Sequence, residues 1–464
     1  GLVTIIANLT TAAGFTVFAF GDVDLLSEFG TVMSLSILAT FFLSVCLVAI
    51  IYSYLPSPSL RSIKHLDIRY LKAFLDFLVR LALKHKKWVY SINILLILLG
   101  IWGMMMLKPL AYLVDDLPET SGVRSDLKFF EDNFSGVMPL EVIIDTKKSR
   151  GLRKRGTLAK ADSLEMELSK LSEIGKPLSI VDYLKSANQV YFNGDTNFYA
   201  LPDSRNWVFF QKYVSKPADD SQDDLSKYFV DSLEQRMRIS FKVADMGSIR
   251  MKEMLAKDIQ PTIERIFDKS VEVQVTGTMP IFAKGNTYLI NNLFWSILIA
   301  VILVGFANGL IFTSLRLVII SLIPNIIPML VTAGLMGFLG IPLKPSTMIL
   351  FSIVLGIAVD DTIHFLAHYR LQLDKDSDHI HAVITSIKET GLSMIYTSIV
   401  LMAGFSIFIF SEFQGTVSLG LLSASTLFVA MLTNLTILPV LLLSLDPQRQ
   451  KKSEDEYIEE SEKE

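Results

Sequence analysis

Eight apolar segments, each about 20 residues or longer, dominate this 464-residue sequence. A helix of that length crosses the hydrocarbon core of a bilayer, so each segment is long enough to be a membrane span. The eight predicted spans are 2–20, 29–54, 88–107, 290–312, 317–340, 346–369, 391–411 and 416–445. With 51% hydrophobic residues, 19% charged residues and a mean hydropathy of +0.45, the chain is too apolar for a soluble protein of this size. We expect a multi-pass protein of the cytoplasmic membrane.

The spans and the charges between them predict six regions. These are 1–55 (two spans ending a shortened first repeat), 56–87 (a cytoplasmic amphipathic linker), 88–107 (one span), 108–289 (an external domain), 290–445 (a five-span second repeat) and 446–464 (a disordered cytoplasmic tail). Eight Lys and Arg residues lie between Arg61 and Lys87, and basic loops stay on the cytoplasmic side. The net charge of −4 makes nucleic acid an unexpected partner.

The external block has the pattern of one α+β domain. Residues 138–146, 236–245 and 270–277 alternate like strands, and 157–174 has a helical period. This order predicts a ferredoxin-like domain, so the fold class is an α-helical polytopic membrane protein with one external ferredoxin-like domain. The block contains no nucleophile–base pair, metal-ligand cluster or phosphate loop, and Cys46 is the single cysteine of the chain. We therefore expect no enzyme activity, no cofactor and no metal.

An internal repeat relates the two ends of the chain. When Gly1 is set against Gly391, nine of thirty positions are identical without a gap. Both copies enter from the inside and return after an acidic turn, so the repeat is parallel, as in many transporters. The counterpart of Asp360 would lie about thirty residues before Gly1 at this offset, and we expect an N-terminal half to be missing.

Two adjacent carboxylates, Asp360 and Asp361, interrupt the sixth span in "SIVLGIAVDDTIHFLAHYR". They lie roughly 20 Å from the start of the span near Ser346, well inside the hydrocarbon layer. A carboxylate at that depth costs at least about 2.5–3.5 kcal/mol, and burial favours its neutral form, so the pair is placed to gain and lose protons. An aspartyl protease dyad is excluded, because adjacent helical residues point about 100° apart. The alternative is a structural hydrogen-bond node.

Several neighbours of the acids have side chains that could assist them. His364 is within reach of both carboxylates, and Gly356, one turn earlier, lets a neighbouring helix approach closely. Hydroxyl groups of Thr362, Tyr396, Thr397 and Ser398 could hydrogen-bond an acid, and Asn8, Thr10 and Thr11 could do so from the first repeat copy. The alternatives are that the hydroxyls bond their own helix backbone, that His364 is purely structural and that His368 is interfacial.

The motifs "GIAVDDTIHFLAHYR", "VTGTMPIF" (275–282) and the two "AGF" turns (13–15 and 403–405) resemble those of the resistance-nodulation-division (RND) superfamily. The likeness is to its lipid- and hydrophobe-exporting branch, which includes MMPL-like, hopanoid-exporting and Patched-related proteins, and it covers nearly the whole chain. It implies a secondary transporter in which membrane acids exchange protons while external domains move substrate. The drug-efflux branches place a lysine opposite the acids, whereas no mid-membrane lysine is present here.

From the acids and the resemblance together we expect a proton-coupled exporter of a lipid or other hydrophobic compound. The proton relay would be Asp360, Asp361 and His364, supported by Gly356, Thr362 and the seventh-span hydroxyls. The expected partners are the membrane, protons, a hydrophobic small molecule, the missing N-terminal half, and a second copy or a periplasmic protein. A sterol- or lipid-sensing receptor-like relative and a Sec-associated export subunit are the alternatives.

Overall fold

The computed structural model describes residues 2–20, 24–55, 69–107, 112, 114, 116–118, 120–134, 136–203, 207, 228–312, 314–376 and 378–444. The chain divides into two compact units, a membrane unit (Gly1–Lys108 and Leu289–Glu464) and a soluble unit (Pro109–Tyr288). The whole predicted tail, 446–464, and the first part of the predicted linker, 56–68, lie outside the described residues. Each unit has its own hydrophobic core.

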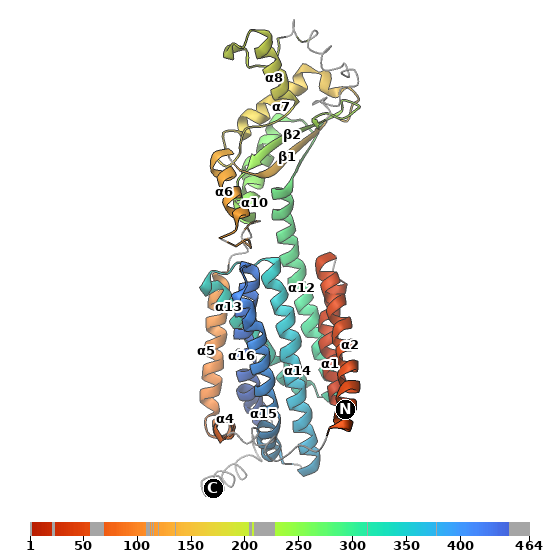
Figure 1. The fold of residues 1–464 in the computed structure, drawn as a ribbon, viewed down its shortest axis with the longest axis vertical. Coiled ribbons are helices and arrows are strands. Elements are labelled where there is room, and N and C mark those ends of the chain that lie inside the picture. The colour runs from red at the N-terminus through yellow and green to blue at the C-terminus, as the bar shows by residue number, and fades with distance from the viewer. Residues whose placement is uncertain are drawn as a thin grey trace. The chain divides into compact units, whose positions relative to one another are not determined.

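Long apolar helices lie side by side in the membrane unit (Figure 1). Within the described residues, seven helices are long and apolar enough to cross a membrane. They are α2 (Asp24–Tyr54), α5 (Lys86–Met105), α12 (Thr278–Phe312), α13 (Leu315–Leu339), α14 (Pro345–Asp376), α15 (His379–Ser406) and α16 (Gln414–Leu443). The first predicted span is an 18-residue helix, α1 (Leu2–Ala19), which is not among the seven. The polytopic helical class is confirmed, and the eighth span stays a prediction.

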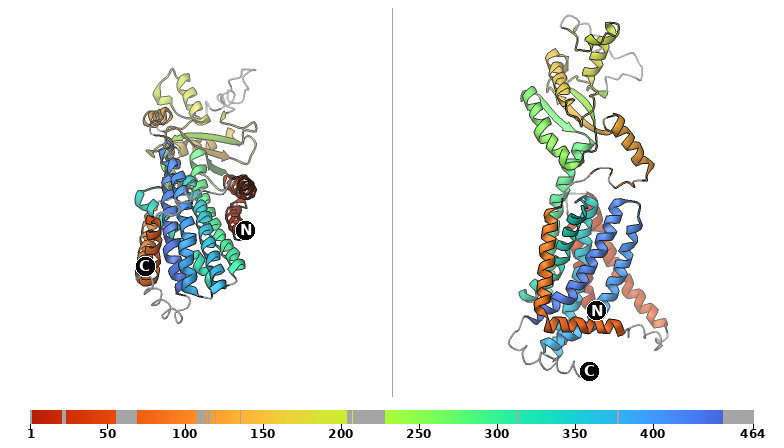
Figure 2. Two further views of the ribbon diagram at one scale, coloured as in Figure 1. Left: turned by 60° about the horizontal axis from the view of Figure 1, so that its bottom comes forward. Right: turned by 90° about the vertical axis from the view of Figure 1, so that its left-hand side faces the viewer.

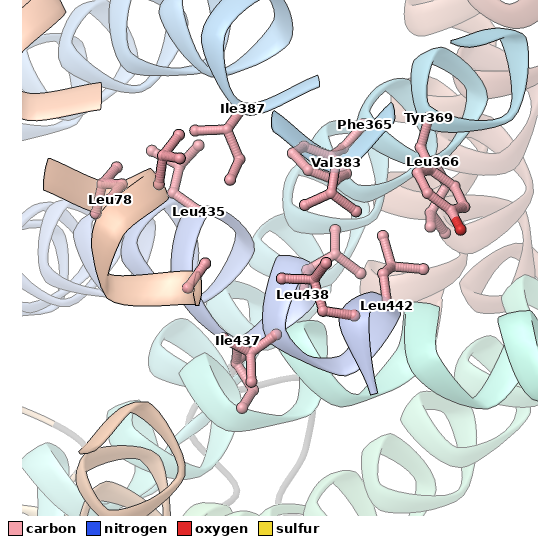
Figure 3. Packing of buried hydrophobic residues seen from close by; sticks show 14 of the residues in the cluster. Leu78, Phe365, Leu366, Tyr369, Val383, Ile387, Leu435, Ile437, Leu438 and Leu442 are labelled. Atoms are coloured by element: carbon pink, nitrogen blue, oxygen red, sulfur yellow. The ribbon is translucent and has the colours of Figure 1, made fainter. Parts of the chain in front are cut away.

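The described part of the predicted amphipathic linker is helix α4 (Arg69–Lys84). It lies across one end of the helical bundle (Figure 2, right). Its apolar face is buried in the same core cluster as residues of α14, α15 and α16, and Figure 3 shows Leu78 of α4 beside Leu435 of α16. On its polar side, Asp76 forms an ion pair with Lys388 of α15, with 3.1 Å between Oδ1 and Nζ. Apolar residues that recur at helical spacing give α4 one apolar face, and that face packs on the bundle.

Glycines bring α5 and α13 into backbone contact. A Cβ added at Gly100 would lie 2.8 Å from the carbonyl oxygen of Leu330, and one added at Gly334 would lie 2.6 Å from the Cα of Gly100. Gly103 and Gly337 face each other in the same way. Small residues at helix contacts are the usual means of tight packing in membranes, where apolar burial gives little preference for protein over lipid.

The soluble unit contains a three-stranded antiparallel sheet in the order β2-β1-β3. Its strands are β1 (Met138–Asp145), β2 (Arg236–Val243) and β3 (Glu272–Thr276), each within a predicted range. Alternate residues such as Leu140 and Ile239 are fully buried, because one face of the sheet packs on helices. The helices of this unit are α6 (Gly122–Phe134), α7 (Arg155–Leu168), α8 (Ile180–Tyr191), α10 (Gly247–Met254) and α11 (Gln260–Ile266), with a π-helical turn, η5 (Leu255–Ile259), between the last two.

The sheet order contains one split βαβ unit. Strands β2 and β3 both run antiparallel to β1, so they are parallel to each other, and α10–α11 connects them while β1 lies between them. A ferredoxin-like domain has a further strand beside β2. At that edge the described residues show isolated bridges, Ile174 with Val243 and Leu178 with Ser240, and no regular strand. The ferredoxin-like assignment therefore stays a prediction.

Candidate functional site

Helix α14 has two polar stripes on opposite faces. Gly356, Asp360 and His364 are spaced four residues apart and lie on one face. Thr362 is two residues from Asp360, about 200° around the helix, and lies on the other face. Asp361 falls between the two stripes. The two acids therefore point to different sides of α14, about 100° apart.

The first stripe contains a carboxylate–imidazole pair whose side chains are partly exposed. Nε2 of His364 lies 3.5 Å from Oδ1 of Asp360, and the two side chains are 37% and 42% exposed. The Oδ1 atom itself is buried and has no hydrogen-bond partner among the described residues. Asp361 is half-buried. The spacing of three to four residues in the sequence thus corresponds to a real approach of His364 to Asp360.

Helix α1 packs against this stripe at Gly356. The hydroxyl of Thr11 donates a hydrogen bond to the carbonyl oxygen of Gly356 at 3.2 Å. A Cβ at Gly356 would lie 3.1 Å from a ring carbon of Phe15, so a larger residue would push α1 away. The two helices run antiparallel (Figure 1), and Asn8, one turn before Thr11, lies at the level of Asp360. Thr10 has a side chain outside the described set.

The second stripe is a fully buried hydrogen-bond chain. Thr362 was expected to bond an acid, but its hydroxyl lies 2.8 Å from Oδ1 of Asn434 on α16 and 3.1 Å from Oδ1 of Asn325 on α13. Its own helix offers a third acceptor, the Ala358 carbonyl oxygen, at 3.2 Å. A hydroxyl has one proton, so it can serve one of these acceptors at a time.

The chain continues from Asn325 to a fourth helix. The amide of Asn325 donates to the Ser321 carbonyl oxygen at 2.7 Å, and the amide of Asn308 on α12 donates to the Ser321 hydroxyl at 2.9 Å. Asn308, Ser321, Asn325, Thr362 and Asn434 are all fully buried. Oδ1 of Asn308 has no partner within the described residues. Five neutral polar side chains therefore tie α12, α13, α14 and α16 together beside the acids.

The predicted hydroxyl residues Tyr396, Thr397 and Ser398 lie on α15. Thr397 is exposed and donates to its own backbone, to the Ser393 carbonyl oxygen at 3.1 Å and to that of Met394 at 3.0 Å. This is the alternative that hydroxyl residues in membrane helices often follow. Ser398 is buried and Tyr396 is half-buried. His368 lies 3.2 Å from the Ser386 hydroxyl and 3.0 Å from Glu389, so it joins α14 to α15.

Sequence reasoning missed the three asparagines of the buried chain. Asn308, Asn325 and Asn434 each lie within an apolar span, and polar side chains in such spans are costly unless they have partners. A search of the spans for amides would have found them. It would not have assigned their partners, because these come from helices far apart in the sequence.

The soluble unit contains a second cluster of buried charge, between α7 and α8. Glu165, 1% exposed, accepts a hydrogen bond from Ser179 at 2.5 Å, and Lys185 lies 3.7 Å from its other oxygen. Lys185 also pairs with Asp162. Burial raises the pKa of Glu165 to about 8, although the Ser179 bond and the Lys185 charge lower it. No group of three metal-ligating side chains occurs among the described residues.

These helices, with charged and amide side chains inside the apolar bundle, define a multi-pass membrane protein. The MMPL family model matches residues 213–457, more than half of the chain, and the protein belongs to the MMPL family. This agrees with the RND resemblance of its motifs.

Individual relatives extend the likeness. The chain is 25% identical over 335 residues to the membrane protein MJ1562 of Methanocaldococcus jannaschii, which covers 70% of this chain and 82% of that protein. It is 31% identical over 144 residues to the hopanoid transporter HpnN of Burkholderia multivorans, covering 30% of this chain and 16% of HpnN. It is 22% identical over 225 residues to HpnN of Rhodopseudomonas palustris, covering 47% and 25%. The chain thus spans a quarter or less of these two transporters.

Proposed function

We propose that this protein is a proton-coupled secondary transporter that exports a lipid or other hydrophobic compound across the cytoplasmic membrane. The observation that carries the proposal is the Asp360–Asp361 pair within an apolar helix, with His364 at 3.5 Å from Asp360. Acids inside a membrane helix are costly, and they are typical of proton and ion pathways. The named function of the two hopanoid transporters supports a hydrophobic substrate.

In this proposal a proton binds the Asp360 carboxylate from one side of the membrane and leaves to the other side. His364 stabilises the ionised carboxylate when its imidazole is protonated. The side chains of Asp360 and His364 are partly exposed, so water or a neighbouring helix can reach them. Asp361 lies between the first stripe and Thr362 around the helix.

The coupling to movement would follow from the contacts on both faces of α14. A change of charge at Asp360 would alter the stability of the packing between α1 and α14, which approach closely at Gly356. On the opposite face, the single proton of Thr362 can switch between Asn325 and Asn434. Two arrangements of nearly equal energy are what an alternating transporter requires. The soluble unit would be external and would act with a periplasmic protein or a second copy.

The test is proton-driven transport by the full-length protein in proteoliposomes under an imposed pH gradient. Asp360→Asn and Asp361→Asn keep size and hydrogen bonding but remove titration, and we expect each variant to insert normally and to lose gradient-driven export. Asp374→Asn, an exposed acid near the end of the same helix, is the matched control and should retain it. Full activity in the double Asn variant would show that the acids are a structural node. Lipid binding without gradient-driven turnover would instead favour a lipid-sensing relative.

A further inference from the structure

A groove of about 730 Å³ lies within the soluble unit, between β3, the α10–η5–α11 segment and the first turns of α12. We call it the β3–α12 groove. Its volume is in the range of small-molecule sites, about 300–1,000 Å³. Strand β3 is at the edge of the sheet, and no strand pairs with its outer side among the described residues. The π-helical turn η5, which supplies Leu255 and Ala256, forms part of the wall.

The groove has apolar lining residues, and its charged lining residues are all positive. Leu255, Ala256, Val273 and Val275 provide apolar surface, and Lys252 and Lys284 provide two ammonium groups. No Asp or Glu is among the described residues that line the groove. Both lysines are exposed, and neither has an ion pair within the described part of the chain.

We propose that the β3–α12 groove binds one anionic lipid, with its acyl chain on the apolar wall and its acidic headgroup paired with Lys252 and Lys284. The proposal rests on the proposed lipid transport and adds the place and the charge of the substrate. A small soluble anion would leave the apolar wall of the groove exposed to water. A strand added to the edge of β3 would have no need of the two lysines.

The position of the groove along the chain also suits a lipid. Helix α12 contributes Ala283, Lys284 and Thr287 to the lining, and the membrane unit begins two residues later at Leu289. The same continuous helix therefore carries groove residues and then enters the membrane-spanning segment.

The experiment uses the full-length protein in proteoliposomes with two photoactivatable probes, a diazirine analogue of palmitic acid and the matching palmityl alcohol. After irradiation, labelled peptides are mapped by mass spectrometry. We expect the acid to label peptides from 252–260 and 273–287, and the alcohol to label them about fivefold less, as a partly exposed pair of charges can provide. Lys252→Gln with Lys284→Gln should reduce labelling by the acid to the level of the alcohol.

Two further variants define the site. Ala256→Trp fills the groove from an exposed position and should remove labelling by both probes. Lys257→Gln with Lys269→Gln removes two exposed lysines of the same unit that do not line the groove, and should leave labelling unchanged. The thermal unfolding midpoint of each variant checks that it is folded, and the lysine variants, which alter exposed side chains, keep the test valid if Ala256→Trp does not fold.

Equal labelling by acid and alcohol, or labelling unaffected by the lysine pair, overturns the proposal. So does labelling confined to membrane helices, which would indicate contact with the bilayer. Labelling needs no pH gradient, so the Asp360→Asn and Asp361→Asn proteins should be labelled like the wild type. Loss of the groove signal with intact gradient-driven transport would reject the groove alone. Normal labelling with unimpaired transport by the Asn variants would reject the proton-coupled function alone.

Discussion

The acids of the two units have different nitrogen partners and different exposure: Glu165 is 1% exposed, and the Asp360 side chain is 42% exposed. In the soluble unit, Glu165 has a lysine, Lys185, at 3.7 Å and a capping hydroxyl, Ser179, at 2.5 Å. In the membrane unit, Asp360 lies 3.5 Å from His364. Lysine has an ordinary pKa near 10.4 and stays charged at neutral pH, whereas histidine gains and loses its charge in that range. Burial raises the pKa of Glu165 to about 8 despite its lysine, so a permanent cation beside a buried acid does not by itself keep that acid ionised.

The neutral polar residues follow the same division. The membrane unit ties four helices together with fully buried amides and hydroxyls, Asn308, Ser321, Asn325, Thr362 and Asn434. The soluble unit places ion pairs around its buried acid instead. The desolvation free energy of an ion pair is smaller near water than in the hydrocarbon layer. Inside the membrane, hydrogen bonds between neutral side chains satisfy polar groups without desolvating a charge. Position within the chain therefore decides which kind of polar contact is stable.

Glu165→Gln has the largest expected effect. The folded-state pKa of Glu165, about 8, lies above its ordinary value of 4.5, so between these values the folded unit holds a proton that the unfolded chain releases. The contribution of Glu165 to the free energy of unfolding is thus fully present below pH 4.5 and is lost as the pH rises to 8, by up to roughly 3–5 kcal/mol at about 1.4 kcal/mol per unit. Glu165→Gln should remove most of this fall.

The measurement is urea unfolding of residues 109–288, which have their own core and are expected to fold alone with mixed α and β circular dichroism. The pKa of Asp145, about 2, lies below its ordinary value of 3.8, so its contribution is lost only below pH 3.8 and does not overlap the window of Glu165. Asp145→Asn is therefore a suitable control. A wild-type unit equally stable at pH 5 and pH 8 would contradict the prediction.

Thr362→Val should destabilise the membrane unit by about 2 kcal/mol, because two buried asparagine oxygens lose the hydroxyl that they share. The valine keeps the shape of the side chain, so the effect reports the hydrogen bond. Thermal unfolding in detergent measures it. The control is Thr397→Val, which removes an exposed hydroxyl bonded to its own helix and should change stability by less than about 0.5 kcal/mol. Equal effects at the two positions would mean that the buried chain is not an energetic link.

His364→Ala has the smallest expected effect on folding and a specific one on transport. We expect weaker gradient-driven transport or a shifted pH optimum, because the carboxylate of Asp360 loses the group that can become its cationic partner. Initial rates in proteoliposomes between pH 5.5 and 8.5 measure the profile. His368→Ala is the matched control, since His368 bonds Ser386 and Glu389 and lies away from the acids. An unchanged profile in His364→Ala would remove His364 from the relay.

The sequence by itself determined the local elements and the local pairs. The positions of β1, β2 and β3 follow from alternation of apolar residues, and the long helices follow from uninterrupted apolar runs. The approach of His364 to Asp360 also follows from the sequence, because residues four apart on a helix are neighbours whatever surrounds them. These features depend on periods of two or 3.6 residues that can be read within one segment.

The tertiary structure decided which segments meet. That α1 covers Gly356, that Thr362 bonds Asn325 and Asn434, and that β1 lies between β2 and β3 all join residues far apart in the chain. A hydroxyl in an apolar span can bond its own backbone, as Thr397 does, or another helix, as Thr362 does. Both choices satisfy the same local rule, and the difference is set by which neighbouring helix presents an acceptor. No periodicity contains that information.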